Sequence, residues 1–107
     1  MEYKKIPSSY KVGGQRIDIR NVERCDNNDM GTCYYAGGFI EISKYVDKDT
    51  LQSEDSKINT FYHEVTHSIL RAMGEYELNR NETFVCSFSS FLCEAMGKAV
   101  FIEEEKK

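Results

Sequence analysis

The sequence predicts an α+β fold in which a small antiparallel β-sheet precedes two long helices. Three observations predict this class. Two Gly-Gly dipeptides each separate short segments of alternating or aromatic residues in the first half of the chain. Apolar residues recur every three or four positions along two long segments of the second half. The chain has 107 residues, of which 40% are hydrophobic and 30% are charged, a length and balance typical of one globular domain.

Two β-hairpins are predicted before the helices. The first covers residues 10–19, where Gly13-Gly14 supplies the turn and isoleucines alternate with polar residues in the returning strand. The second covers residues 32–42, where Gly37-Gly38 is the turn between an aromatic strand and an alternating one. Together they predict an antiparallel sheet of about three to four strands with one face covered.

The first long helix is predicted from about Thr50 to about Met73, with Gly74 as a left-handed C-cap. Its apolar stripe consists of Ile58, Phe61, Val65, Ile69, Ala72 and Met73. At about 100° per residue, this stripe centres nearly opposite His63 and His67. We therefore expect one face of the helix to pack on the sheet and the other face to meet the second helix.

The second long helix is predicted from about Asn81 to about Val100, with Asn79 or Asn81 as its N-cap. A polar connection over residues 74–80 would let it fold back antiparallel to the first helix. Its apolar stripe consists of Phe84, Phe88, Phe91, Leu92, Ala95, Met96 and Ala99.

Composition and charge restrict the expected surroundings and partners. One domain is expected over residues 1–107, with a flexible lead-in at 1–9 and a flexible tail at 103–107. The net charge is −4 and no basic stripe occurs, so we expect no nucleic-acid or membrane partner. The polar N-terminus lacks the apolar core of a signal peptide, and no apolar run reaches transmembrane length, which predicts a cytoplasmic protein. No pattern predicts the oligomeric state.

Two other candidate metal patterns lack the required spacing. The four cysteines are not arranged as C-x-x-C pairs, so reduced thiols are expected at Cys25, Cys33, Cys86 and Cys93. The Asp- and Asn-rich residues 25–31 lack the ligand spacing of an EF-hand loop, so a solvated loop without calcium is expected there.

The segment His63-Glu64-Val65-Thr66-His67 is the strongest chemical pattern in the sequence. It contains both histidines of the chain and lies within the first long helix. Positions i and i+4 of a helix share one face, so the two imidazoles can bind one Zn²⁺ ion. Glu64 is then placed to act as general base on a water molecule at the metal. The alternative is that both histidines are polar residues on a solvated helix face.

A catalytic zinc ion usually takes three protein ligands, so a carboxylate or thiolate must complete the set. Glu82, at the start of the second long helix, is the preferred candidate, and Glu75 and Glu77 in the connection are the alternatives. With this set Glu64 stays unligated, which favours an open catalytic site over a closed structural one. Three nearby residues are candidates for stabilising an oxyanion: Tyr62, Tyr76 and Arg80.

The motif at 63–67, followed by Glu82-Thr83-Phe84-Val85-Cys86-Ser87-Phe88, resembles the gluzincin metallopeptidases. More narrowly, it resembles small phage and mobile-element members related to the ImmA/IrrE metallopeptidases, over roughly residues 30 to 96. The resemblance implies a minimal zincin-like fold with a small sheet before two helices. It also implies zinc ligands and a catalytic base at the residues singled out above: His63, His67 and Glu82 as ligands, with Glu64 as the base.

One position departs from the family pattern. Cys86 stands where such proteins often have Asp or Asn, which orients a ligand histidine. A thiol would be a weaker partner for the histidine, or it could approach the metal itself. Larger relatives also carry additional domains, and family members typically cleave a regulatory protein such as a repressor.

The expected function is therefore that of a zinc metallopeptidase, a hydrolase that cleaves a peptide bond in a protein or peptide substrate. By resemblance, the substrate would be a regulatory protein or repressor. The alternative is a non-enzymatic module, either zinc-binding or metal-free, that binds a protein without cutting it.

Overall fold

The computed structural model describes residues 6–99 and residue 102, and it confirms the predicted α+β class. One sheet has the spatial strand order β1-β2-β4-β3. Its strands are β1 (Ser9–Val12), β2 (Gln15–Val22), β3 (Gly31–Tyr34) and β4 (Phe39–Ser43). Part of the predicted flexible lead-in belongs to this sheet, because the Ser8 carbonyl accepts a hydrogen bond from the Ile19 amide at 3.0 Å. Residues 1–5 of that lead-in and the predicted tail at 103–107 lie outside the described residues.

Both predicted hairpins form. β1 pairs antiparallel with β2, and β3 pairs antiparallel with β4. However, β2 and β4 lie side by side and run parallel, with Ile19 opposite Ile40, so the sheet is mixed rather than antiparallel throughout. The sequence pattern does not predict this pairing. A Gly-Gly turn specifies only the pairing of the two strands that it connects, whereas residues 23–38 separate β2 from β4 in the chain.

The first long helix, α1 (Glu54–Met73), begins later than the predicted Thr50. Its N-cap is Ser53, whose hydroxyl accepts a hydrogen bond from the Ser56 amide at 3.1 Å. The chain just before this cap is held on the sheet, because the buried Gln52 side chain donates to the Ser43 carbonyl at 2.6 Å. The predicted C-cap is confirmed, since Gly74 ends the helix with φ 78 and ψ 17.

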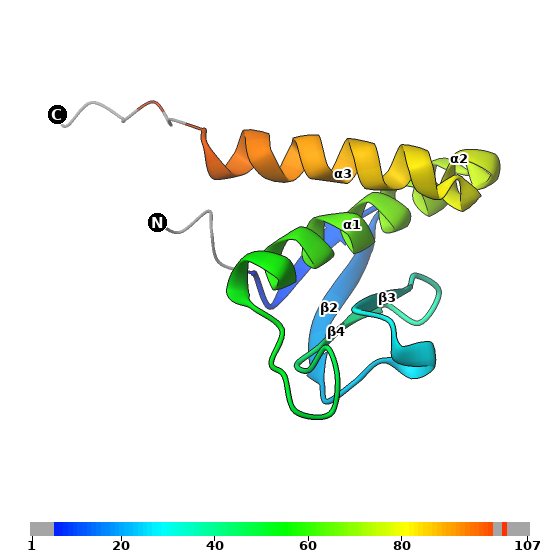
Figure 1. Ribbon diagram of the computed structural model, residues 1–107. Helices are drawn as coiled ribbons and strands as arrows, with labels where there is room; N and C mark the ends of the chain where they lie inside the picture. Colours follow the sequence, from blue (N-terminus) through cyan, green and yellow to red (C-terminus); the bar gives the residue numbers. More distant parts are fainter. Residues whose placement is uncertain (1–5, 100–101, 103–107) are drawn as a thin grey trace, which may run out of the picture.

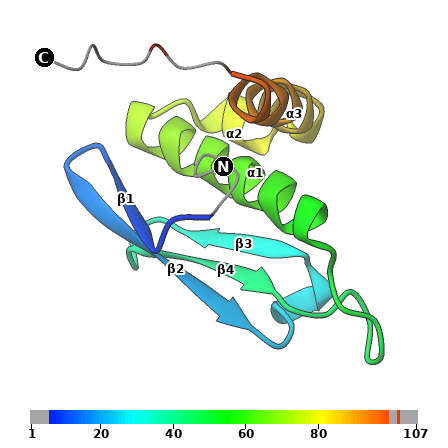
Figure 2. The same ribbon diagram turned by 90° about the vertical axis from the view of Figure 1, so that its left-hand side faces the viewer.

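The helices form two layers on one face of the sheet. α1 lies across the sheet, and α3 (Glu82–Gly97) packs on the side of α1 that faces away from the sheet (Figure 1). The predicted polar connection contains a further short helix, α2 (Tyr76–Arg80). Figure 2 shows the same layers from the side, with α1 between the strands and α3. Among residues 6–99, no helix combines the length and apolar character needed to span a bilayer.

The core lies between the sheet and α1. It is a cluster of Ile17, Ile40, Ile42 and Phe61, all nearly inaccessible to solvent. The predicted apolar stripe of α1 describes this contact only in part. Phe61 is buried and Val65 packs against the core, but Ala72 and Met73 are exposed, while the polar Glu64 is buried. α1 has neighbours on two sides, so its buried surface is wider than one stripe.

The predicted apolar stripe of α3 is also only partly buried. Phe88 and Phe91 are 47% and 71% exposed, whereas Val85 and Ser89 are buried. The reason is that α3 packs mainly on α1, so no element among residues 6–99 covers the outward side of α3. The helix ends at Gly97 with Lys98 as its C-cap, earlier than the predicted end near Val100, and Val100 itself lies outside the described residues.

Candidate metal centre

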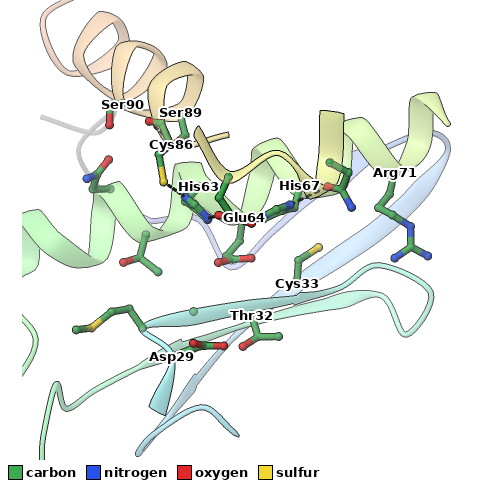
Figure 3. Close-up of a pocket in the computed structure, with 16 residues that line it drawn as sticks. Asp29, Thr32, Cys33, His63, Glu64, His67, Arg71, Cys86, Ser89 and Ser90 are labelled. Atoms are coloured by element: carbon green, nitrogen blue, oxygen red, sulfur yellow. Dashed lines mark hydrogen bonds and ion pairs between the residues drawn. The ribbon is translucent and has the colours of Figure 1, made fainter. Parts of the chain in front are cut away.

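A pocket of about 570 Å³ opens between α1, β3 and the start of α3. All the predicted site residues line it: His63, Glu64, His67 and Glu82. Figure 3 shows the two histidines on successive turns of α1, with Glu64 pointing from the same helix toward β3. The two alternative ligands, Glu75 and Glu77, are exposed and do not line the pocket.

The carboxylate of Glu82 lies between the two imidazoles. Its Oε1 is 3.3 Å from Nε2 of His63, and its Oε2 is 3.4 Å from Nε2 of His67. Glu82 occupies this place because it is the first residue of α3, where Asn81 caps the helix by accepting a hydrogen bond from the Phe84 amide at 3.0 Å. The short helix α2 turns the chain back so that this helix start faces α1.

A hydrogen bond to an acceptor on α2 orients one of the histidines. Nδ1 of His67 donates to the side-chain oxygen of Asn79 at 2.7 Å. In a neutral imidazole the other nitrogen, Nε2, then carries a lone pair. This lone pair points toward Glu82, so two electron-pair donors face each other at 3.4 Å. Such an arrangement favours a cation between them, because a metal ion or a proton removes the repulsion.

The separations also fit a metal ion. Ligand atoms placed about 2.1 Å from a tetrahedral zinc ion lie about 3.4 Å from one another. The two nitrogen-to-oxygen separations at Glu82 are 3.3 Å and 3.4 Å. Burial, with a further contribution from the neighbouring His67, lowers the pKa of His63, although Glu82 acts in the opposite direction. Neutral imidazole is the form that binds metals, so this shift favours coordination.

Cys86, on α3, lies beside His63 of α1. Its Sγ is 4.0 Å from Nδ1 of His63. His63, Glu82 and Cys86 together form a group that could hold a metal ion, with ligand atoms within 4.8 Å of one another. Two arrangements are therefore available to the thiol. It can accept a hydrogen bond from Nδ1 of His63 while Nε2 faces Glu82, or it can serve as a ligand itself.

Glu64 is buried, with only 5% of its surface exposed, although it lines the pocket. Burial raises its pKa to about 8, and the charges of Glu82 and Asp29 add to this shift. Gly31 on β3 makes room for the Glu64 side chain. A Cβ atom at Gly31 would lie 3.2 Å from Cγ of Glu64 and 2.5 Å from Cγ2 of Thr60.

No sequence pattern identifies several of the residues that form the site. Asn79 is considered only as a helix cap, a role that belongs to Asn81. Gly31 and Arg71 also line the pocket, and no motif marks either residue. By contrast, the three predicted oxyanion candidates do not line it: Tyr62, Tyr76 and Arg80.

Comparison of the chain with protein-family models, curated proteins and solved structures finds no match. Membership of the gluzincin metallopeptidases, which the motifs at residues 63–67 and 82–88 suggest, therefore stays a prediction.

Proposed function

We propose that the protein is a zinc-dependent peptidase in which His63, His67 and Glu82 hold the ion and Glu64 is the general base. One observation carries this proposal. Nε2 of each histidine faces a different oxygen of Glu82, while the Glu64 carboxyl group stays free in the same pocket. Three converging ligands leave room for a fourth, exchangeable position, which distinguishes catalytic zinc sites from closed structural ones.

The donor set supports zinc over other common ions. Two imidazoles with a carboxylate and a nearby thiol suit zinc, whereas magnesium and calcium prefer shells made only of oxygen. When bound, the ion would act as a Lewis acid that polarises the substrate carbonyl and lowers the pKa of water in the site.

Glu64 has the position and acidity of a general base. Its carboxylate would accept a proton from the attacking water and then deliver it to the leaving amine nitrogen. Burial raises the pKa of Glu64 to about 8, and a bound cation nearby would lower this pKa toward the operating pH. His67 is held for its ligand role by Asn79, whose side-chain oxygen accepts from Nδ1 at 2.7 Å.

The substrate class is a protein or peptide. An open pocket next to the edge strand β3 leaves space for an extended chain beside Glu64. A regulatory protein as the natural substrate follows only from the resemblance described above.

The test combines metal content with peptide cleavage. The protein is purified, loaded with zinc and assayed for bound metal by mass spectrometry and for cleavage of a mixed peptide library. We expect one zinc ion per chain and cleavage by the unchanged protein. Glu64→Gln should keep the zinc and abolish cleavage, while Glu75→Gln, outside the pocket, should change neither. A protein that takes up no zinc, or cleavage that survives Glu64→Gln, would contradict the proposal.

Cys86 supports a second candidate, a closed zinc site without catalysis. If the thiolate joined both histidines and Glu82 as a fourth ligand, the ion would have no exchangeable position and would act as a structural clip. X-ray absorption at the zinc edge separates the two candidates, because it detects a zinc–sulfur bond at about 2.3 Å. The peptidase proposal predicts that this bond is absent and that Cys86→Ser still binds zinc.

A further inference from the structure

The pocket carries opposite charges at its two ends. Arg71, one helical turn beyond His67, lines one end, and Asp29, just before β3, lines the other. Figure 3 shows Glu64 between them, below the two histidines. A line from Asp29 past Glu64 to Arg71 therefore runs beside α1 and β3, from a negative charge to a positive one.

The residues along β3 follow the same order, from Asp29 past Glu64 to Arg71 (Figure 3). Gly31 at the start of β3 lies against Glu64, since a Cβ built on Gly31 would be 3.2 Å from Cγ of Glu64. Cys33, farther along the strand, lies between Glu64 and Arg71. Burial raises the pKa of the Cys33 thiol to about 12. The charge of Glu64 also raises this pKa, whereas the charge of Arg71 lowers it, so both side chains are near Cys33. Asp29 precedes Gly31 and thus extends toward the opposite end.

Both end charges are available to a ligand. Arg71 is exposed, and among the ion pairs of residues 6–99 none includes it. Its guanidinium lies 5.8 Å from the ring centre of Tyr35, which gives the side chain a platform on the β3–β4 hairpin. At the other end, the backbone of Asp29 is fixed because its carbonyl accepts a hydrogen bond from the Ser43 hydroxyl at 2.7 Å. The Asp29 carboxylate is exposed.

We propose that Arg71 and Asp29 select peptides with an acidic residue on one side of the cleaved bond and a basic residue on the other. This inference rests on the proposed function, because it takes Glu64 as the point at which the bond is cleaved. The acidic side chain binds the Arg71 guanidinium, which suits planar carboxylates, and the basic side chain binds Asp29.

The spacing of the two charges follows from the geometry of the elements. Arg71 is seven residues after Glu64 on α1, about 10 Å along the helix axis at about 1.5 Å per residue. An extended peptide advances about 3.3 Å per residue, so the acidic residue lies about three residues from the cleaved bond. Asp29 is two residues before Gly31, which places the basic residue about two positions away on the other side. The selected peptide thus carries its opposite charges about five residues apart.

A simpler role for Arg71 makes a different prediction. Arg71 lies in the last turn of α1, where a cation stabilises the helix dipole. That role affects folding stability alone and gives no preference among peptides. The experiment therefore measures which peptides the pocket retains, with thermal stability recorded in parallel.

The probe is a synthetic decapeptide library with randomised positions, incubated with the zinc-loaded Glu64→Gln protein so that bound peptides are retained uncut. Mass spectrometry identifies the retained peptides. We expect enrichment of peptides with an acidic and a basic residue about five positions apart. Adding Arg71→Glu should lower the enrichment of the acidic residue by about tenfold, with Arg71→Gln giving a smaller loss. Arg80→Glu, the same charge change on α2 outside the pocket, should leave the enrichment unchanged.

The retention experiment tests peptide selection by Arg71 and Asp29 independently of peptidase activity. Charge-selective retention that depends on Arg71 supports it, even if the unchanged protein cleaves nothing, an outcome that contradicts only the peptidase proposal. Retention without charge preference, retention unaffected by Arg71→Glu and Arg71→Gln, or no retained peptide overturns it. If Arg80→Glu lowers the enrichment as much as Arg71→Glu does, the overall charge rather than the pocket is responsible, and the inference is also overturned.

Discussion

Nδ1 of His67 donates a hydrogen bond to the side-chain oxygen of Asn79 at 2.7 Å, so α2 determines which nitrogen of this imidazole faces Glu82. Asn79→Ala removes the acceptor and frees the ring to rotate. We expect zinc affinity to fall about 10- to 100-fold, as for other partners of metal-binding histidines. Competition with a fluorescent zinc chelator measures this change, and Asn79→Asp, which keeps an acceptor oxygen, should restore most of the affinity.

Asn81 provides the matched control for this substitution. Its side chain caps α3 by accepting from the Phe84 amide, and Asn81 is not among the residues that line the pocket. Asn81→Ala should cost about 1 kcal/mol of unfolding free energy through the lost cap. Equal losses of zinc affinity in the two variants would show that Asn79 acts through folding and not through His67.

The third ligand is tested by comparing glutamates. Glu82→Ala removes the carboxylate that lies 3.3 Å and 3.4 Å from the histidine nitrogens, so zinc affinity should fall by at least about 100-fold. Glu75→Ala and Glu77→Ala, both on exposed residues outside the pocket, should leave it unchanged. Isothermal titration with zinc ranks the three variants, and a larger loss at Glu75 or Glu77 would assign the ligand role elsewhere.

The sequence predicts part of this site for a clear physical reason. His63 and His67 share a face because helix geometry alone places positions i and i+4 one turn apart. Asn79 and Gly31 have no such local signal. Asn79 depends on the path of α2 between the two long helices, and Gly31 depends on how closely β3 approaches α1. Both are relationships between elements, which residue spacing does not encode.

The close approach of β3 to α1 depends on Gly31. With Gly31→Ala, the new Cβ would lie 2.5 Å from Cγ2 of Thr60 and 3.2 Å from Cγ of Glu64. Overpacking of this kind costs about 1–3 kcal/mol, so the midpoint of thermal unfolding should fall. Adding Thr60→Ser should recover part of the loss, because serine lacks Cγ2 and keeps a hydroxyl for Gln52. Gly97→Ala, where a Cβ meets nothing within 4 Å, should not reduce stability.

A Gly31→Ala protein as stable as the unchanged one would show that β3 can move away from α1 at no cost. The close packing of Glu64 and Thr60 against Gly31 would then contribute little to stability. The same variant should also lower peptide cleavage, because Glu64 would shift from its place beside the histidines.

The stability of the metal-free protein should depend on pH through Glu64. Burial raises the pKa of this carboxyl from 4.5 to about 8. The folded protein therefore holds a proton that the unfolded chain releases, and the free energy of unfolding should decrease as pH rises from about 4.5 to about 8. Glu64→Gln removes this dependence. Urea denaturation in the presence of a chelator, across this pH range, measures it.

His63 contributes to the pH dependence of stability with the opposite sign. The unchanged protein must therefore be compared with Glu64→Gln. Burial lowers the pKa of His63 from 6.5, so the stability contributed by this group rises with pH and is lost as pH falls through that range. Because His63 is present in both proteins, the difference between unchanged protein and Glu64→Gln isolates the carboxyl group. A difference that does not vary with pH would mean that Glu64 is ionised in the folded protein.

The fold is predictable where local signals act and unpredictable where layers meet. Gly74 ends α1 as predicted, since a left-handed C-cap is a property of a few adjacent residues. The exposure of Phe88 and Phe91 is different, because it depends on α3 being an outer layer with α1 as its main neighbour. Hydrophobic spacing gives a helix an apolar side but does not say whether another element covers that side.

We propose above that His63, His67 and Glu82 bind one zinc ion while Glu64 stays free. Anomalous diffraction from crystals grown with zinc, collected on both sides of the zinc absorption edge, tests it most directly. We predict one strong peak between Nε2 of both histidines and the Glu82 carboxylate, with the Glu64 carboxylate and the Cys86 sulfur outside the coordination sphere. No peak at this position, or a peak bonded to Glu64 or Cys86, would contradict the account.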